Sequence, residues 1–234
     1  MIAQAITILA TPVISRLYAP ADIGMMASIT AVVSIIGVIA AGRYDLAIVL
    51  PEAEEDALSV AGAGAATATV LSGIVFLAFL LFGRQMAPLL GLGTAQPGLL
   101  LWIAPMVLFV GLQQVFQRLL IRGKGFRGLA TSQVLEKVGI AGTKVGLGFG
   151  PGGIGSLLVA SLLGYLAHLT ALVVSARDAL RLHWKSVSWS RVRQQASRYR
   201  RFPLLLSWSG LFNTASLQLP VILFASLYSP TVAG

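Results

Sequence analysis

The chain has 234 residues, of which 56% are hydrophobic and only 11% are charged. A soluble domain carries roughly 25% charged residues, so this composition excludes an ordinary soluble globular protein. The chain has no cysteine, which excludes a disulfide framework, thiolate catalysis and cysteine-ligated metal centres. The net charge of +9 fits loops that face an anionic membrane surface better than it fits a nucleic-acid partner, because the chain is so apolar. The composition predicts a polytopic membrane protein.

Long apolar stretches predict an all-α transmembrane bundle of about seven spans, since a helix needs roughly 20 apolar residues to cross the hydrocarbon core. Residues 1–15 are apolar but too few to cross, and we expect them to be the end of a span whose beginning is missing. The stretch 130–150 is the weakest, because it is rich in glycine and holds charged residues. The complete candidates are residues 23–42, 57–83, 99–117, 130–150, 152–176 and 202–227.

The lysines and arginines predict the orientation of the spans. Thirteen of the seventeen lie in alternate connections, which follow the spans 23–42, 99–117 and 152–176. Basic connections stay in the cytoplasm, so we expect these connections and the N-terminus to be cytoplasmic.

The longest basic connection, residues 177–201, also contains Trp184, Trp189 and Tyr199. Aromatic side chains of this kind favour the level of the lipid headgroups. We expect an amphipathic segment that lies on anionic lipid, and a specific lipid or partner site is the alternative.

An internal repeat predicts how the chain is organised. The pattern L-Y-x-P-x-x-x-G occurs at residues 17–24 and again at 227–234, and each copy follows an apolar span. Two copies that lie six spans apart are typical of a duplicated transporter whose halves run parallel. Residues 1–200, including the basic linker 177–201, are therefore predicted to form a six-helix lobe, and residues 202–234 to begin a second lobe.

Two motifs near the N-terminus carry a family resemblance. P-x-x-S-R-L-Y-x-P-x-x-x-G occupies residues 12–24, and G-R-Y-D-L-A-I-V-L-P occupies residues 42–51. The region 11–60 that contains them resembles the bacterial oligosaccharide flippases of O-antigen and exopolysaccharide synthesis. These belong to the multidrug/oligosaccharidyl-lipid/polysaccharide exporter superfamily. The resemblance implies two six-helix lobes around a central cavity, alternating access in the bacterial inner membrane, and an undecaprenyl-diphosphate-linked glycan as substrate.

The predicted span 130–150 holds three ionisable residues, Glu136, Lys137 and Lys144. A charge inside a span is costly and marks a functional site by default. The two lysines are seven residues apart and so share one face of a helix, where they can attract the diphosphate of such a substrate. The alternative is that Glu136 offsets Lys137 locally while Lys144 snorkels to the outer interface.

Arg43 and Asp45 flank Tyr44 at the cytoplasmic end of the span 23–42, within the second motif. The guanidinium of Arg43 can make a bidentate contact with diphosphate oxygens at the entrance to a cavity. Equally, Arg43 can be an orientation anchor that Asp45 holds in place.

Further polar residues in the spans are candidates for the lining of a cavity. Gln114, Gln117 and Arg118 share one face of the span 99–117 and its cytoplasmic end, and Asn213 lies in the span 202–227. Such side chains also serve as hydrogen-bonding links between helices. We expect the series Gly142, Gly146 and Gly150 to allow close helix packing, because it repeats G-x-x-x-G.

No motif predicts an enzyme, a metal site or a cofactor. His168 has no metal partner at ligand spacing and is expected to be structural, and no catalytic constellation or nucleotide loop is present in the sequence. The predicted partners are a lipid-linked oligosaccharide, membrane lipids and the polysaccharide polymerase machinery, with no nucleic acid. The alternative functions are a multidrug exporter of the same superfamily, a membrane enzyme of polysaccharide assembly and a non-transporting scaffold.

Overall fold

The computed structural model describes residues 2–90, 92, 97–150, 152–183 and 187–227, and these residues form helices and turns without a β-strand. A short helix, α3 (Tyr44–Ala47), follows α2, and α8 (Trp189–Arg198) follows α7. A 3₁₀ turn (Pro97–Trp102) leads into α5, and a π-helical turn (Phe202–Leu206) leads into α9. The long helices are α1 (Ile2–Leu17), α2 (Pro20–Gly37), α4 (Glu54–Leu89), α5 (Ile103–Arg122), α6 (Phe126–Gly148), α7 (Gly153–His183) and α9 (Ser207–Leu227).

Each predicted span therefore corresponds to a helix, but several boundaries differ. The predicted span 23–42 is helical as far as Gly37 and continues as turns, in which Ile39 and Ala40 donate hydrogen bonds to carbonyls three residues earlier, up to the left-handed Gly42 and Arg43. The basic connection 177–201 is largely helical, since α7 runs on to His183 and α8 follows. Residues 184–186, with Trp184, and residues 228–234, with most of the second repeat copy, lie outside the described residues.

Among the described residues, five helices are long and apolar enough to cross a membrane. They are α2, α4, α5 with its 3₁₀ turn, α7, and α9 with its π turn. The predicted span 130–150 is not among them, because the charges of α6 lower its hydropathy. The all-α polytopic membrane bundle predicted from the sequence is confirmed.

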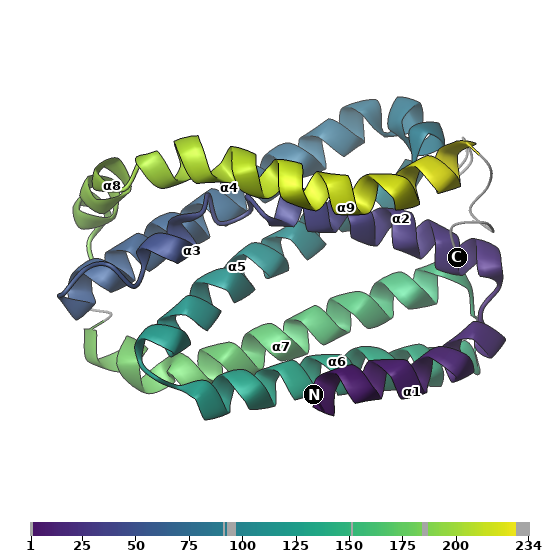
Figure 1. Ribbon diagram of the computed structural model, residues 1–234, viewed down its shortest axis with the longest axis horizontal. Coiled ribbons are helices and arrows are strands. Elements are labelled where there is room, and N and C mark those ends of the chain that lie inside the picture. Colours follow the sequence, from purple (N-terminus) through teal and green to yellow (C-terminus); the bar gives the residue numbers. More distant parts are fainter. Residues whose placement is uncertain (1, 91, 93–96, 151, 184–186, 228–234) are drawn as a thin grey trace.

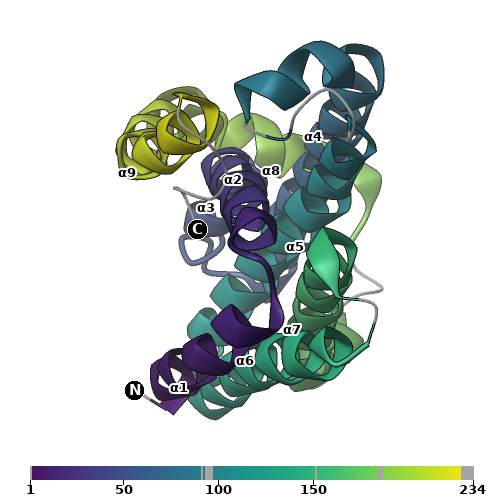
Figure 2. The same cartoon turned by 90° about the vertical axis from the view of Figure 1, so that its right-hand side faces the viewer.

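The helices form two groups that α5 connects. One group contains α6 and α7, which lie antiparallel, with α1 along α6 (Figure 1). The other contains α2, α4, α8 and α9, with α9 along α2 and α8 against α4. Seen from the end, the two groups diverge from their contacts with α5 (Figure 2). The division of the chain into lobes at residue 200 stays a prediction.

Clusters of buried apolar side chains hold these helices together. The larger cluster joins α2, α5 and α7 through residues such as Ile29, Ile103 and Leu158, all of which are fully buried. The smaller cluster joins α3, α4 and α8 through Ile48, Val60 and Val192. Large apolar side chains stay exposed on the outer faces of α1, α4 and α9, as expected of surfaces that lie in lipid.

Close helix packing does not use the predicted glycine series. A Cβ atom added at Gly142 or Gly146 would meet nothing within 4 Å, so the expected packing role of these residues is wrong for this structure. On α6, Gly128 and Gly139 face α7, since their added Cβ atoms would lie 2.7 Å from the Cβ of Ser175 and 3.8 Å from the Cα of Gly164, respectively. The position of α7 decides which glycines of α6 pack against it.

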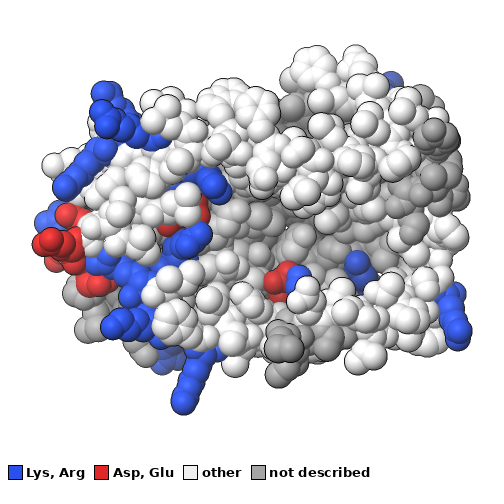
Figure 3. Space-filling model, viewed as in Figure 1, with Lys and Arg blue, Asp and Glu red and all other residues white. Residues whose placement is uncertain are grey.

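Charge is concentrated at one end of the bundle. Arginines and lysines gather at the left end in Figure 3, next to acidic side chains. This end holds α8 and the start of α4, which carries Glu54, Glu55 and Asp56 in its first turn. The face shown in Figure 3 is also hollowed between the two helix groups, and charged side chains lie inside the hollow.

Candidate functional site

Both lysines of α6 line a hollow between α1 and α6. This hollow has a volume of about 310 Å³, and Thr7, Thr11 and Ser15 of α1 face the lysines across it. Lys137 and Lys144 lie on one stripe of the helix, as their spacing predicts. Neither lysine is fully buried, and the side chain of Lys137 is 41% exposed. A compact, mobile ammonium in such a place can bind an anion and release it again.

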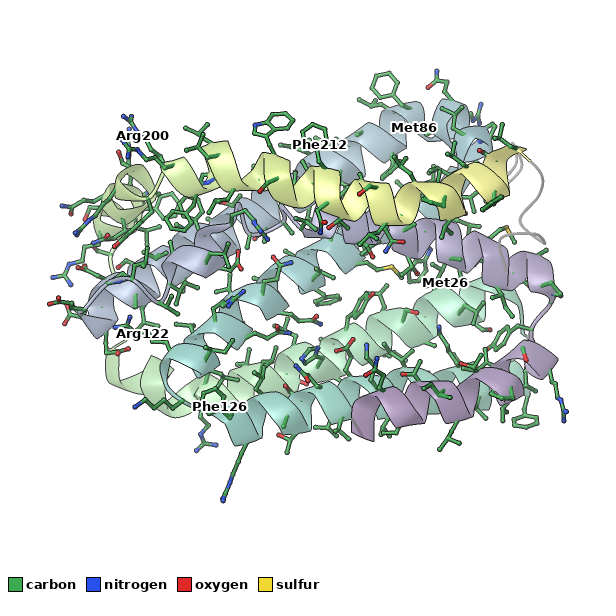
Figure 4. The ribbon with its side chains drawn as sticks, viewed as in Figure 1. Met26, Met86, Arg122, Phe126, Arg200 and Phe212 are labelled. Atoms are coloured by element: carbon green, nitrogen blue, oxygen red, sulfur yellow. The ribbon has the colours of Figure 1, made fainter. Side chains whose placement is uncertain are left out.

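Lys144 also lines a second, adjoining hollow. This space has a volume of about 350 Å³ and is bounded by α2, α7 and α9, which contribute Met26, Thr30, Leu157 and Gln218. Met26, labelled in Figure 4, points from α2 into the space between the two helix groups. Lys144 therefore lines hollows that residues of both helix groups bound, so a ligand that enters between the groups can reach it.

A tyrosine of the first motif positions the Lys144 segment. The Tyr18 hydroxyl donates a hydrogen bond of 2.7 Å to the backbone carbonyl of Lys144, and Tyr18 is itself buried. Gly148 completes this contact, because its added Cβ would lie 3.0 Å from Leu17 and 3.1 Å from the Tyr18 ring. The turn between α1 and α2 thus fixes the end of α6 that carries Lys144.

Glu136 lies between Lys137 and a histidine of α7. One carboxylate oxygen accepts a hydrogen bond of 3.0 Å from the Lys137 Nζ. The other oxygen lies 2.6 Å from the Nδ1 atom of His168. The side chain of Glu136 is 12% exposed and that of His168 is 2% exposed. The structure thus brings a buried histidine to the predicted ionisable residues of α6.

Arg43, Asp45 and Arg118 form a second cluster near the basic end of the bundle. The Arg118 Nε atom lies 3.6 Å from a carboxylate oxygen of Asp45, which is 4% exposed. Arg43 holds a strained left-handed conformation (φ 56°), and its guanidinium lies against Gly210 of α9. Strain of this kind persists only where the surrounding structure enforces it. This geometry fits an anchor that ties α3 to α5 and α9, and a role in binding an anion stays a prediction.

We expect the stability of Asp45→Asn against unfolding to depend less on pH than the stability of the parent protein. Burial raises the pKa of the Asp45 carboxyl above its ordinary value, and the nearby Arg118 and Arg43 guanidiniums only partly oppose this effect. A raised pKa means that the folded state binds the proton more tightly. The protonated Asp45 carboxyl therefore contributes fully to stability below about pH 4, and this contribution is lost as the pH rises through the raised pKa.

Thermal unfolding of the purified protein in detergent between pH 4 and pH 7 measures this effect. The difference in unfolding temperature between Asp45→Asn and the parent should grow in favour of the variant as the pH rises. Parallel curves for the two proteins would contradict the expectation.

The remaining predicted cavity residues lie in three settings. Gln114 donates a hydrogen bond of 2.9 Å to the backbone carbonyl of Gly37 and so links α5 to α2. Gln117 is half-buried on α5, one turn away from Gln114, and Asn213 is exposed on α9. The structure does not gather these three side chains with Lys137 and Lys144, and their role in binding stays a prediction.

Further polar contacts hold the basic end together. The Arg122 guanidinium donates hydrogen bonds to the backbone carbonyls of Ile48, Pro51 and Glu52 and to the carboxylate of Glu54. Arg122 and Arg200 lie at the same end of the bundle in Figure 4. Tyr44, of the second motif, donates a hydrogen bond of 3.1 Å to the Ala196 carbonyl and thereby ties α3 to α8.

The outer face of α8 is basic and aromatic. An open hollow of about 1170 Å³ lies beside this helix, lined by Trp189, Arg193, Arg198, Arg200 and Arg201 among others. The inner face of α8 packs Val192 against Gly62 of α4. This amphipathic helix matches the segment that the sequence predicts for residues 177–201, and contact with anionic lipid stays a prediction.

Sequence reasoning missed the contacts of two side chains near the site. His168 was expected to be structural, and Tyr18 had no expected contact. His168 carried a usable signal, because an ionisable residue within a predicted span is a functional candidate by default. Nothing in the sequence points to Glu136 as its partner, since the two residues lie on different helices.

Fold and site together define a multi-pass α-helical membrane protein whose interior carries cationic side chains. A family model described as "Polysaccharide biosynthesis protein" matches residues 13–234, and the chain belongs to this family. This match confirms the resemblance that the two N-terminal motifs carry. No curated protein and no solved structure matches the chain.

Proposed function

We propose that the protein moves an undecaprenyl-diphosphate-linked oligosaccharide from the cytoplasmic to the periplasmic leaflet by alternating access. The observation that carries this proposal is the position of Lys137 and Lys144, which line adjoining hollows inside the bundle. Membership of a polysaccharide biosynthesis family supports the glycan part of the substrate. The diphosphate supplies the negative charge that the two ammoniums attract, and the polyprenyl tail stays in lipid.

The charge balance of the site favours an anion. Lys137 and Lys144 outnumber the single carboxylate of Glu136, so the hollow between α1 and α6 has an excess of positive charge. A transporter of cationic drugs would need the opposite balance, because buried cations repel a cationic ligand. This balance favours a lipid-linked anion over the alternative of a multidrug exporter.

The basic end of the bundle is proposed to face the cytoplasm, in the inner membrane of a bacterium. Arginines of α8 and the neighbouring loops gather there, as the positive-inside rule requires. In this orientation α8 lies on the anionic cytoplasmic leaflet and contacts its lipids. The N-terminus is then cytoplasmic as well, and a polysaccharide polymerase on the periplasmic side is a further proposed partner.

Rescue of a bacterial strain that lacks its own lipid-linked oligosaccharide flippase tests the proposal. The full-length protein should restore surface polysaccharide and reduce the pool of lipid-linked oligosaccharide in the cytoplasmic leaflet. Restored drug resistance without surface polysaccharide would favour the multidrug exporter. A chemically altered glycan on the carrier would indicate an enzyme instead, and no change in either readout would contradict transport.

A further inference from the structure

His168 is a buried ionisable group inside the bundle that lies against a carboxylate. Its side chain is 2% exposed, its Nδ1 atom lies 2.6 Å from a carboxylate oxygen of Glu136, and its Nε2 atom has no hydrogen-bond partner among the described residues. Buried polar atoms of this kind are rare, because an unmade hydrogen bond costs about 1–3 kcal/mol. Histidine is also the side chain whose ordinary pKa allows it to change charge near neutral pH.

Glu136 connects this histidine to the hollow between α1 and α6. Its two carboxylate oxygens face different partners, with the Lys137 Nζ at 3.0 Å on one side and the His168 Nδ1 at 2.6 Å on the other. Lys137 in turn lines the hollow, together with Lys144. A single carboxylate is therefore shared between a buried histidine and a lysine that a ligand can reach.

We propose that His168 and Glu136 form a proton-binding site that controls the charge Lys137 offers to a phosphate in the hollow. When His168 is neutral, the carboxylate of Glu136 neutralises Lys137. When His168 binds a proton, the same carboxylate is balanced by the imidazolium, and the ammonium of Lys137 is freed for a ligand. The inference rests on the proposed function, because it takes the hollow to be the phosphate site.

Coupling of this kind is reciprocal. The charge of the site rises by one unit on protonation, and an added positive charge strengthens the attraction of a phosphate most in a low-dielectric interior. By thermodynamic linkage, a bound phosphate must strengthen proton binding by the same factor. The protein would therefore take up protons from solution as the phosphate binds.

Histidine is the residue type at this site whose ordinary pKa lies closest to neutral pH. The described residues that line the hollow from α1 and α2 are uncharged. The other ionisable groups near the site are Lys137 and Lys144 on α6 and Tyr165 on α7, which lies close to Glu136. From α5, the uncharged Gln113 donates a hydrogen bond of 2.8 Å to the Tyr165 carbonyl. Lysine and tyrosine ordinarily titrate above pH 9.

Calorimetric titration of the purified full-length protein with farnesyl diphosphate tests the proposal. Measurements at pH 6.5 in two buffers that differ in ionisation enthalpy give the number of protons taken up on binding. A pH series from 6 to 8 gives the change in affinity. The diphosphate itself titrates near pH 6, so the readout is the difference between the parent and His168→Gln.

We expect the parent to take up more protons than His168→Gln and to lose up to about tenfold more affinity between pH 6 and pH 8, as a pKa change of one unit requires. His183→Gln is the matched control. It removes the other histidine of this sequence, which lies fifteen residues along the same helix, and should behave like the parent.

Glu136→Gln provides a second test of the proposal if His168→Gln fails to fold. This variant frees Lys137 at every pH, so its affinity should exceed that of the parent at pH 8 and lose the extra pH dependence. Equal proton uptake in the parent and His168→Gln, or an unchanged pH dependence in Glu136→Gln, would overturn the inference while leaving the function intact. Absence of farnesyl diphosphate binding to the parent would instead contradict the proposed function.

Discussion

Lys144→Ala is expected to abolish rescue of surface polysaccharide by the full-length protein while leaving its amount in the membrane unchanged. Lys144 lines both hollows and is held in place by the hydrogen bond from Tyr18 to its carbonyl, which the substitution keeps. A hydrogen bond to a charged group is worth about 1.5–3 kcal/mol. Its loss should therefore weaken diphosphate binding by roughly 10-fold to 100-fold.

Two control variants separate the position of this charge from its mere presence. Lys144→Arg keeps the positive charge and should keep a measurable part of the rescue, because a guanidinium also binds phosphate. Arg84→Ala removes an equal charge from the exposed outer surface of α4 and should rescue like the parent. Full rescue by Lys144→Ala at equal expression would remove this residue from the proposed site.

Gly111→Val is expected to prevent accumulation of the folded protein. Gly111 lies where α5 crosses α4 and the turn after α2, and an added Cβ would lie 2.7 Å from the Ala68 Cβ and 2.9 Å from the Ala40 Cβ. These neighbours cannot rotate away, since an alanine methyl group has no further side-chain torsion to adjust. Overpacking of a closed core typically costs about 1–3 kcal/mol, and here it acts on the helix that connects both groups.

Gly73→Val is the matched control for this substitution. Gly73 also lies within a long helix, α4, but its added Cβ would meet nothing within 4 Å. Size-exclusion chromatography with fluorescence detection should show a monodisperse peak for Gly73→Val and a lost or aggregated peak for Gly111→Val. An intact peak of parental height and thermal stability for Gly111→Val would show that α5 does not make this close crossing.

The fold class followed from the sequence because its causes are local along the chain. Burial in lipid requires about 20 consecutive apolar residues and leaves helices as the way to satisfy the backbone in this composition. The segments that became α4, α5, α7 and α9 were therefore readable without a structure. Boundaries were less certain, as the turn at Gly42 and Arg43 shows, because a left-handed conformation leaves little signal in hydropathy.

Only part of the candidate site could be predicted from the sequence. Lys137 and Lys144 stand out because charges in an apolar stretch are costly, and their spacing places them on one helix face. The sequence alone thus determined the membrane class, the helices and the cationic stripe of α6. Only the tertiary structure decided that Glu136 lies beside His168, that Gln218 shares a hollow with Lys144, and that Gly139 rather than Gly142 faces α7. Contacts between helices depend on how whole helices are placed and rotated against one another, and no spacing within a single helix records that placement.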